Sequence, residues 1–206
     1  MTTKGPSASD LATTLGRQVE LLVARVRPYR SAEWEAPSAN PSWSNADTVF
    51  HLVDALTAFT IGVERRADPG RPEFPTPQRP PATWLPGELA AVAGRLVEAL
   101  GKTDAQERVW HPRHRFSART MAAVALSEVV LHRWDVIGPG DRGPEPRAAR
   151  LVLQGLFASQ DDSSANPIAL LLHVAGRVPL EGRRDFPGPD WDWELPDEVA
   201  ADRRRA

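Results

Sequence analysis

The sequence has no cysteine, so disulfides cannot stabilise its fold, and any metal ion must be held by imidazole and carboxylate groups rather than thiolates. Its 25 basic and 27 acidic side chains leave a formal net charge of -2, which argues against a nucleic-acid partner. The N-terminus, MTTKGPSASD, lacks the basic and then apolar pattern of a signal peptide, and no apolar run approaches the length that crosses a bilayer. These absences argue against a membrane partner and predict a cytoplasmic location.

The 206 residues are enough for one ordinary domain, or for one domain with a small appendage. In the first part of the chain apolar residues recur at three- and four-residue steps, which is the stripe of an amphipathic helix. Hydroxyls suited to helix capping precede two further apolar stretches, Ser42 or Ser44 in one case and Ser117 or Thr120 in the other. We therefore predict four helices, over about 9–30, from 45 to about 66, over 86–100 and from 117 to the glycine and proline cluster after 137.

The connection between the second and third helices, residues 68–86, is rich in proline and is expected to be an irregular loop, with a lid as one hypothesis. Four helices with one long connection predict a bundle over residues 1–140. After the cluster, helices are expected over 146–159 and 165–176, and short strands over 177–180 and 191–194. The predicted fold is thus mainly α, with a small α+β C-terminal subdomain over 141–206 whose charged last residues fray.

One pair of side chains in the fourth helix suggests metal chemistry. Glu128 and His132 are four residues apart, so both emerge from one face of the helix and can converge on a single ion. His51 in the second helix can supply a third ligand, and two histidines with one carboxylate are a common set for a catalytic divalent metal. The same spacing also occurs in ordinary helix-surface ion pairs, but the strongly apolar surroundings favour a cation, because an unpaired buried carboxylate is costly.

Several nearby polar residues have two interpretations each. Asp47 and Asp135 lie one turn from His51 and His132, so each either orients that imidazole or makes an ordinary contact, Asp47 in the first turn of its helix and Asp135 with Arg133.

Residues farther along the chain are weaker candidates. His111, Arg113 and His114 either reach an anionic substrate or the polar groups of a cofactor, or belong to a solvated loop. Arg177 is a candidate to bind a carboxylate in a cleft between bundle and subdomain. His173 is interpreted as a core histidine with satisfied hydrogen bonds, and Trp43 and Trp134 as core or pocket wall.

Three segments resemble one known family. The segment PSWSNADTVFHLVDA resembles the helix entry that carries the first metal ligand in the DinB-like superfamily, and SEVVLHRWDV resembles its second metal helix, in the same order and spacing. NPIALLLHVAGRVPL, followed by a tryptophan-containing segment, is similar to the appended domain of the maleylpyruvate isomerase branch. The resemblance implies a four-helix bundle in which His51, Glu128 and His132 bind zinc or a similar divalent ion.

The resemblance also implies a chemistry. Enzymes of that branch use mycothiol, and a metal-bound thiolate would act as nucleophile on a small electrophilic molecule, so that the protein is an S-transferase or an isomerase. Two alternatives stay open: a metal-dependent hydrolase that activates water, and a non-enzymatic binding or stress protein in which the metal is structural. A fourth protein ligand, such as His111 or His114, would favour the structural alternative. The sequence leaves the electrophile open and is compatible with a monomer or a homodimer.

Overall fold

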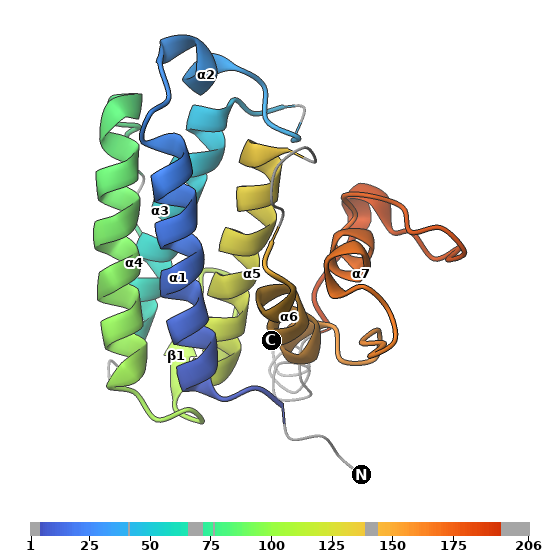
Figure 1. Ribbon diagram of the computed structural model, residues 1–206. Coiled ribbons are helices and arrows are strands. Elements are labelled where there is room, and N and C mark those ends of the chain that lie inside the picture. Colours follow the sequence, from blue (N-terminus) through green and yellow to red (C-terminus); the bar gives the residue numbers. More distant parts are fainter. Residues whose placement is uncertain (1–4, 41, 66–71, 76, 139–143, 195–206) are drawn as a thin grey trace.

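Four long helices form the N-terminal part of the chain: α1 (Ala8–Val26), α3 (Asn45–Glu64), α4 (Leu85–Gly101) and α5 (Ala118–Ile137) (Figure 1). They pack in the cyclic order α1, α4, α3, α5, so each helix contacts two of the others. The structure is a computed structural model and describes residues 5–40, 42–65, 72–75, 77–138 and 144–194. The mainly helical fold with a bundle is thereby confirmed.

Serine side chains fix where three of these helices begin. The hydroxyl of Ser7 accepts a hydrogen bond from the amide of Asp10, and Ser117 does the same for Thr120. At α3, Ser44 and Asp47 satisfy each other's amides in a reciprocal capping box. Of the candidate caps in the sequence, Ser44 and Ser117 therefore cap helices, whereas Ser42 and Thr120 do not.

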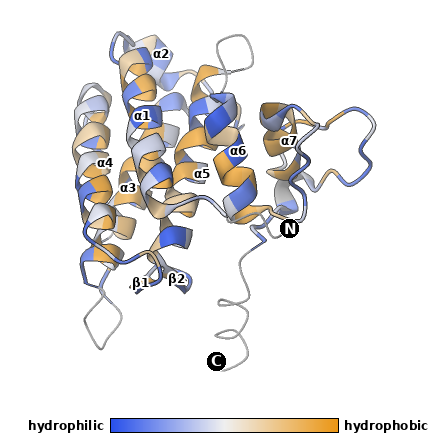
Figure 2. Ribbon diagram, turned by 60° about the horizontal axis from the view of Figure 1, so that its bottom comes forward, coloured by the Kyte–Doolittle hydropathy of each residue, from blue (hydrophilic) through white to orange (hydrophobic). Residues whose placement is uncertain are grey.

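Helix α5 lies at the centre of the structure because α1, α3 and α6 all pack against it. It is therefore buried on nearly every side, and small side chains such as Ala122 and Ala125 allow its neighbours to approach closely. Figure 2 shows apolar residues on the facing sides of the helices and polar residues on their outer sides. The polar groups that α5 carries inward, including Glu128 and His132, are thus placed inside the structure by the packing of the bundle.

The connections contain short elements that the sequence pattern did not indicate. The first helix ends at Val26 rather than near residue 30, and a separate short helix α2 (Ser31–Glu35) follows. In the proline-rich connection, residues 72–75 and 77–81 have no regular structure, as expected, and a 3-10 turn η1 (Ala82–Trp84) leads into α4. Residues 68–71 and 76 of this loop lie outside the described residues, so its action as a lid stays a prediction.

A β-hairpin precedes α5, in a segment for which the sequence analysis predicted no strand. Strands β1 (Arg108–Trp110) and β2 (Arg115–Ser117) are antiparallel, with Val109 opposite Phe116 and both side chains fully buried. The hairpin packs against α3 at Gly62, where a Cβ atom would lie 1.8 Å from the carbonyl oxygen of Trp110. A residue without a side chain is therefore required at this approach.

The C-terminal part contains α6 (Pro146–Leu156), which packs on α5, then α7 (Pro167–Val174), which packs on α6, and a 3-10 turn η2 (Gly188–Asp190) (Figure 1). The predicted strands over 177–180 and 191–194 are wrong. In the first segment the amides of Arg177 and Val178 bond back to the carbonyl oxygen of Leu172, and the second segment pairs with no strand among the described residues. The alternation of Trp191 and Trp193 reflects side-chain packing instead.

Two expectations are not tested by the structure. The division of the chain into two domains at residue 140 stays a prediction, and the expected fraying of the last residues falls on 195–206, outside the described residues. By length and composition α3 is apolar enough to cross a membrane, contrary to the sequence analysis, but that is weak evidence because half of it is buried among other helices, as in a core helix.

Candidate metal centre

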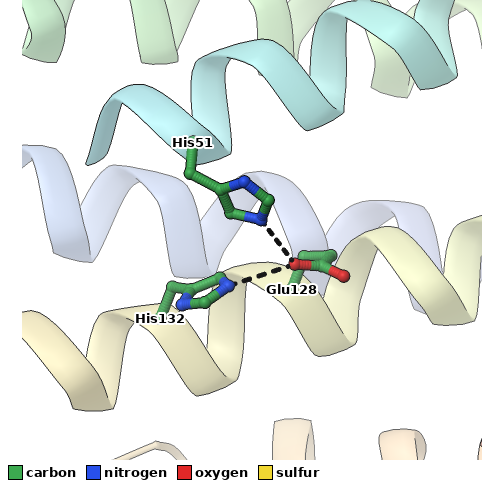
Figure 3. A group of neighbouring side chains, drawn as sticks. All are labelled: His51, Glu128 and His132. Atoms are coloured by element: carbon green, nitrogen blue, oxygen red, sulfur yellow. Dashed lines mark hydrogen bonds and ion pairs between the residues drawn. The ribbon is translucent and has the colours of Figure 1, made fainter. Parts of the chain in front are cut away.

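Three side chains from two neighbouring helices converge on one point. His51 lies in the second turn of α3, and Glu128 and His132 lie one turn apart on the face of α5 that meets α3. The Nε2 atoms of both histidines approach the same oxygen, Oε2 of Glu128, at 3.4 Å from His51 and 3.2 Å from His132 (Figure 3). The structure therefore brings together the three residues that the sequence analysis selected.

The arrangement fits a divalent metal ion. Zinc binds imidazole nitrogen and carboxylate oxygen at about 2.0–2.2 Å, so two such ligands of a tetrahedral ion lie about 3.3 Å apart. The two nitrogen–oxygen separations at Glu128 are close to this value. Within the described residues the cluster of possible ligands has three members, and neither His111 nor His114 joins it. The set would thus leave a position for a ligand from outside the protein.

The surroundings of His132 fix both its orientation and its charge. Its Nδ1 atom lies 2.8 Å from Oδ2 of Asp135, which leaves Nε2 facing Glu128. Burial disfavours the protonated ring, but the hydrogen bonds to Asp135 and Glu128 outweigh burial and raise the pKa of His132 to about 9. The ring without a metal ion is therefore an imidazolium between two carboxylates at neutral pH.

Glu128 is ionised despite its position inside the bundle. Burial alone would raise the pKa of its carboxyl group, but hydrogen bonds with His132 and His51, together with their positive charge, hold that pKa well below its usual range. A carboxylate that is already deprotonated is what metal binding requires.

A cleft of about 440 Å³ opens beside the three residues, all of which line it. Its other walls come from the loop before α3 at Asn40, the hairpin turn at Arg113, and the segment after α7 at Gly176 and Arg177, with Trp191 beyond. The loop before α3, the hairpin turn and the segment after α7 are distant in the sequence but meet beside the cluster. A small molecule in this cleft would contact residues from both the bundle and the C-terminal part.

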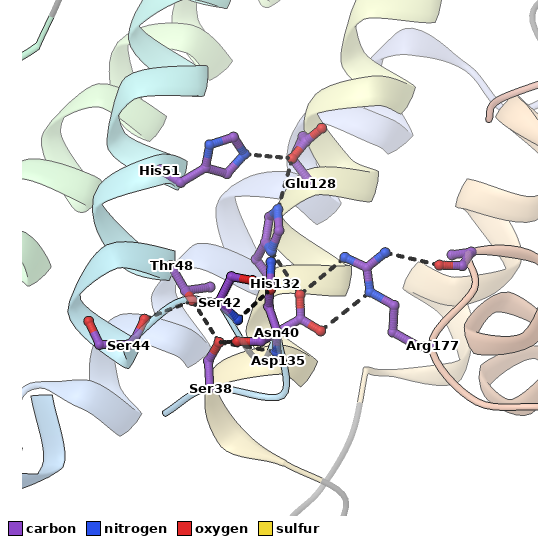
Figure 4. A network of polar contacts seen from close by, with 11 residues as sticks. Ser38, Asn40, Ser42, Ser44, Thr48, His51, Glu128, His132, Asp135 and Arg177 are labelled. Atoms are coloured by element: carbon purple, nitrogen blue, oxygen red, sulfur yellow. Dashed lines mark hydrogen bonds and ion pairs between the residues drawn. The ribbon is translucent and has the colours of Figure 1, made fainter. Parts of the chain in front are cut away.

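Asp135 joins the cluster to the C-terminal part. Its buried carboxylate accepts hydrogen bonds from the Nη2 and Nε atoms of Arg177 at 3.1 and 3.3 Å, in addition to its contact with His132 (Figure 4). Burial raises the pKa of Asp135, but the bonds from His132 and Arg177 more than reverse this and lower it. Of the two partners considered for Asp135, the imidazole of His132 is the one observed, and Arg133 donates to Gln18.

The two arginines of the cleft differ in their partners. Arg177 is paired with Asp135, and its guanidinium lies 5.4 Å from the centre of the Trp191 ring. Arg113 is exposed in the hairpin turn, and it has no ion-pair partner within the described part of the chain. Arg113 is therefore the cation of the cleft whose charge is not already neutralised by the protein.

Other candidates from the sequence occupy different places. The carboxylate of Asp47 caps α3 through Ser44 and pairs with Arg79, so it acts in the first helical turn and has no recorded contact with His51. His111 is buried between the rings of Phe59 and Phe116, away from the cleft, and so is not placed to reach a cofactor there.

The remaining aromatic and histidine candidates behave as expected. Trp134 lines the cleft and so forms pocket wall. The Trp43 ring does not line it, but packs on the ligand side chains, 4.8 Å from the ring of His51 and 5.8 Å from that of His132. His173 is fully buried, accepts from the amide of Leu180 and contacts Asp185, which confirms a core histidine with satisfied hydrogen bonds.

Sequence reasoning missed two parts of the site. Asn40 and Trp191 line the cleft, but Asn40 lies in an irregular segment, and the alternation around Trp191 suggested a strand rather than a cleft wall. The pairing of Arg177 with Asp135, 42 residues apart, also had no local signal. Only the three-residue spacing of His132 and Asp135 was visible in the sequence.

Comparison with protein families gives one match. The model of the mycothiol maleylpyruvate isomerase N-terminal domain matches residues 15–137, which contain the four bundle helices almost completely and all three residues of the cluster. Comparison with curated proteins found no match, and neither did comparison with solved structures.

Proposed function

The chain belongs to the mycothiol maleylpyruvate isomerase N-terminal domain family, and on this basis we propose that it is a metal-dependent enzyme that uses mycothiol on a small electrophilic molecule. The carrying observation is the convergence of His51, Glu128 and His132 beside an open cleft. The proposed activity is that of an S-transferase or an isomerase. When bound, a divalent ion, with zinc as our choice, lowers the pKa of a coordinated thiol and so supplies a thiolate nucleophile at neutral pH.

The protein's own residues would provide the rest of the site. His51 and His132 offer Nε2 and Glu128 offers Oε2 to the ion, with Asp135 holding the His132 ring in place. Trp43, which covers both imidazoles, would exclude water from one side.

Arg113 has a separate proposed role. Its unpaired guanidinium at the cleft would attract an anionic group of the electrophile or the polar groups of the thiol. Arg177 contributes less net charge there because Asp135 neutralises it, although it still forms part of the wall.

The three-membered ligand set favours catalysis over a structural metal. Structural sites usually use four protein ligands, and the histidines that were candidates for a fourth place lie outside the cluster. We further propose a cytoplasmic location, supported by the role of α3 as a core helix. Whether the protein is a monomer or a homodimer stays a prediction.

Calorimetric titration tests the proposal. Zinc-loaded protein should bind mycothiol, and Glu128→Gln, which replaces a charged ligand by a neutral group of similar shape, should lose both zinc and thiol binding. A Glu64→Gln variant is the matched control, since Glu64 on α3 pairs with Arg95 far along the helix from the cluster. Zinc-loaded protein that hydrolyses small esters or amides but has no affinity for mycothiol or any other small thiol would refute thiol use in favour of the hydrolase.

A further inference from the structure

We propose that Asp135 is a positioning residue that couples the metal ligand His132 to the C-terminal wall of the cleft. This inference rests on the proposed metal site. Asp135 is almost completely buried, with 2% of its side chain exposed, and its hydrogen bond to the three-membered cluster is the one with the His132 ring. Its effect on a bound ion would therefore be indirect, through the histidine.

The contact with His132 selects the form of the ring that binds metal. A carboxylate at 2.8 Å from Nδ1 holds a proton on that nitrogen, so the lone pair of the neutral ring lies on Nε2, which faces Glu128 and the cleft. The opposite tautomer would place a proton where the ion has to bind. Asp135 thus determines both the direction and the protonation of the ligand nitrogen.

The contact with Arg177 holds the carboxylate itself. Two guanidinium nitrogens bond to the two carboxylate oxygens, Nη2 to Oδ2 and Nε to Oδ1, which fixes the carboxylate plane as well as its position. Because Oδ2 also accepts from His132, one oxygen links the ligand ring and the arginine. Movement at either end changes the hydrogen bonds available to the other.

Arg177 in turn belongs to a closely packed segment. It donates to the carbonyl oxygen of Ala175 at 2.9 Å and lies over the Trp191 ring. The neighbouring Gly176 has a positive φ of 66°, and a Cβ atom there would lie 1.8 Å from the carbonyl oxygen of Gly188. The cleft wall formed by Gly176, Arg177 and Trp191 is therefore linked to the metal ligand His132 by hydrogen bonds through Asp135. Metal binding that orders His132 should therefore also order this wall.

Zinc affinity of three proteins tests the first half of this inference. We expect Asp135→Asn to bind zinc about 10- to 100-fold more weakly than the wild type, because one amide oxygen cannot replace the carboxylate in both contacts. Asp161→Asn is the matched control: it removes another part-buried aspartate that pairs with an arginine, Arg150, outside the cleft, and its zinc affinity should be unchanged. Equal zinc affinity of Asp135→Asn and the wild type would overturn the inference.

A spectroscopic measurement on the wild type covers the case in which Asp135→Asn does not fold. In nitrogen-15 NMR spectra of the zinc-loaded protein, the proton of His132 should be on Nδ1 and protected from exchange with water. A proton on Nε2, or rapid exchange at Nδ1, would overturn the positioning role without any variant.

Hydrogen–deuterium exchange tests the coupling itself. Zinc should slow amide exchange over residues 175–191 in the wild type and should have no such effect in Asp135→Asn saturated with zinc. Equal protection of this segment in both proteins would contradict coupling through Asp135. If the wild type binds no zinc at all, the proposed function fails instead, so the two failures are distinguishable.

Discussion

Gly62 and Gly94 give a pair of identical substitutions with opposite expected effects. Both lie inside helices, but a Cβ atom at Gly62 would be 1.8 Å from the carbonyl oxygen of Trp110, whereas one at Gly94 would meet no atom within 4 Å. In Gly62→Ala the hairpin must retreat by more than an ångström, since real contacts of this kind are not shorter than 3.0 Å. Overpacking of this size costs about 1–3 kcal/mol. Gly94→Ala instead gains about 0.4–1 kcal/mol, because alanine restricts the unfolded chain and favours helix.

Thermal unfolding followed by circular dichroism measures both effects. For a chain of this size 1 kcal/mol corresponds to about 2–4 °C in Tm, so Gly62→Ala should melt about 2–12 °C below the wild type and Gly94→Ala a few degrees above it. The displaced hairpin also carries Arg113, so Gly62→Ala should impair anion binding in the cleft while zinc binding is retained. A Tm of Gly62→Ala equal to or above that of Gly94→Ala would refute the close packing of hairpin and α3.

Two further predictions concern the cleft. Zinc affinity should increase about tenfold from pH 7 to pH 8 and level off above about pH 9, because below its raised pKa the His132 ring must lose one proton before it can bind the ion. Competition with a chelator at several pH values measures the affinity, and a pH-independent affinity would contradict the prediction. Arg113→Gln should weaken binding of a small carboxylate to the zinc-loaded protein about tenfold, with zinc content unchanged, because roughly one charge-assisted hydrogen bond is lost. Unchanged carboxylate affinity by calorimetry would exclude Arg113 from anion recognition.

The sequence was sufficient to predict the bundle because its signals are local. Apolar periodicity placed α1 and α4, and a serine before an apolar run placed the start of α3 and of α5. The same kind of signal failed for β1 and β2, because strands of three residues are too short to show alternation. It also misplaced strands at 177–180 and at 191–194; in the second segment tryptophans alternate with acidic residues for reasons of packing rather than pairing.

The candidate site shows the same limit. Glu128 and His132 share a helix face at a recognisable spacing, and His51 was proposed as the third ligand from its residue type and helix and then supported by the resemblance of a second segment. The surroundings are different, because Asp135 meets Arg177, 42 residues away, and Trp191, farther along still, only through folding. Asp47 shows the same limit: its spacing to His51 allowed either support for the ligand or a place in the first helical turn, and the structure shows its carboxylate in the helix cap.

The most direct test of the central claim is the metal content of the purified protein by elemental analysis after zinc reconstitution, measured together with His51→Ala, His132→Ala and the control His114→Ala. The account predicts about one zinc per chain in the wild type and in His114→Ala, and loss of zinc from both of the other variants, because His51 and His132, unlike His114, belong to the cluster. A wild type that holds no zinc, or His51 and His132 variants that keep it, would show that His51, Glu128 and His132 are a packed ion-pair group and not a metal centre.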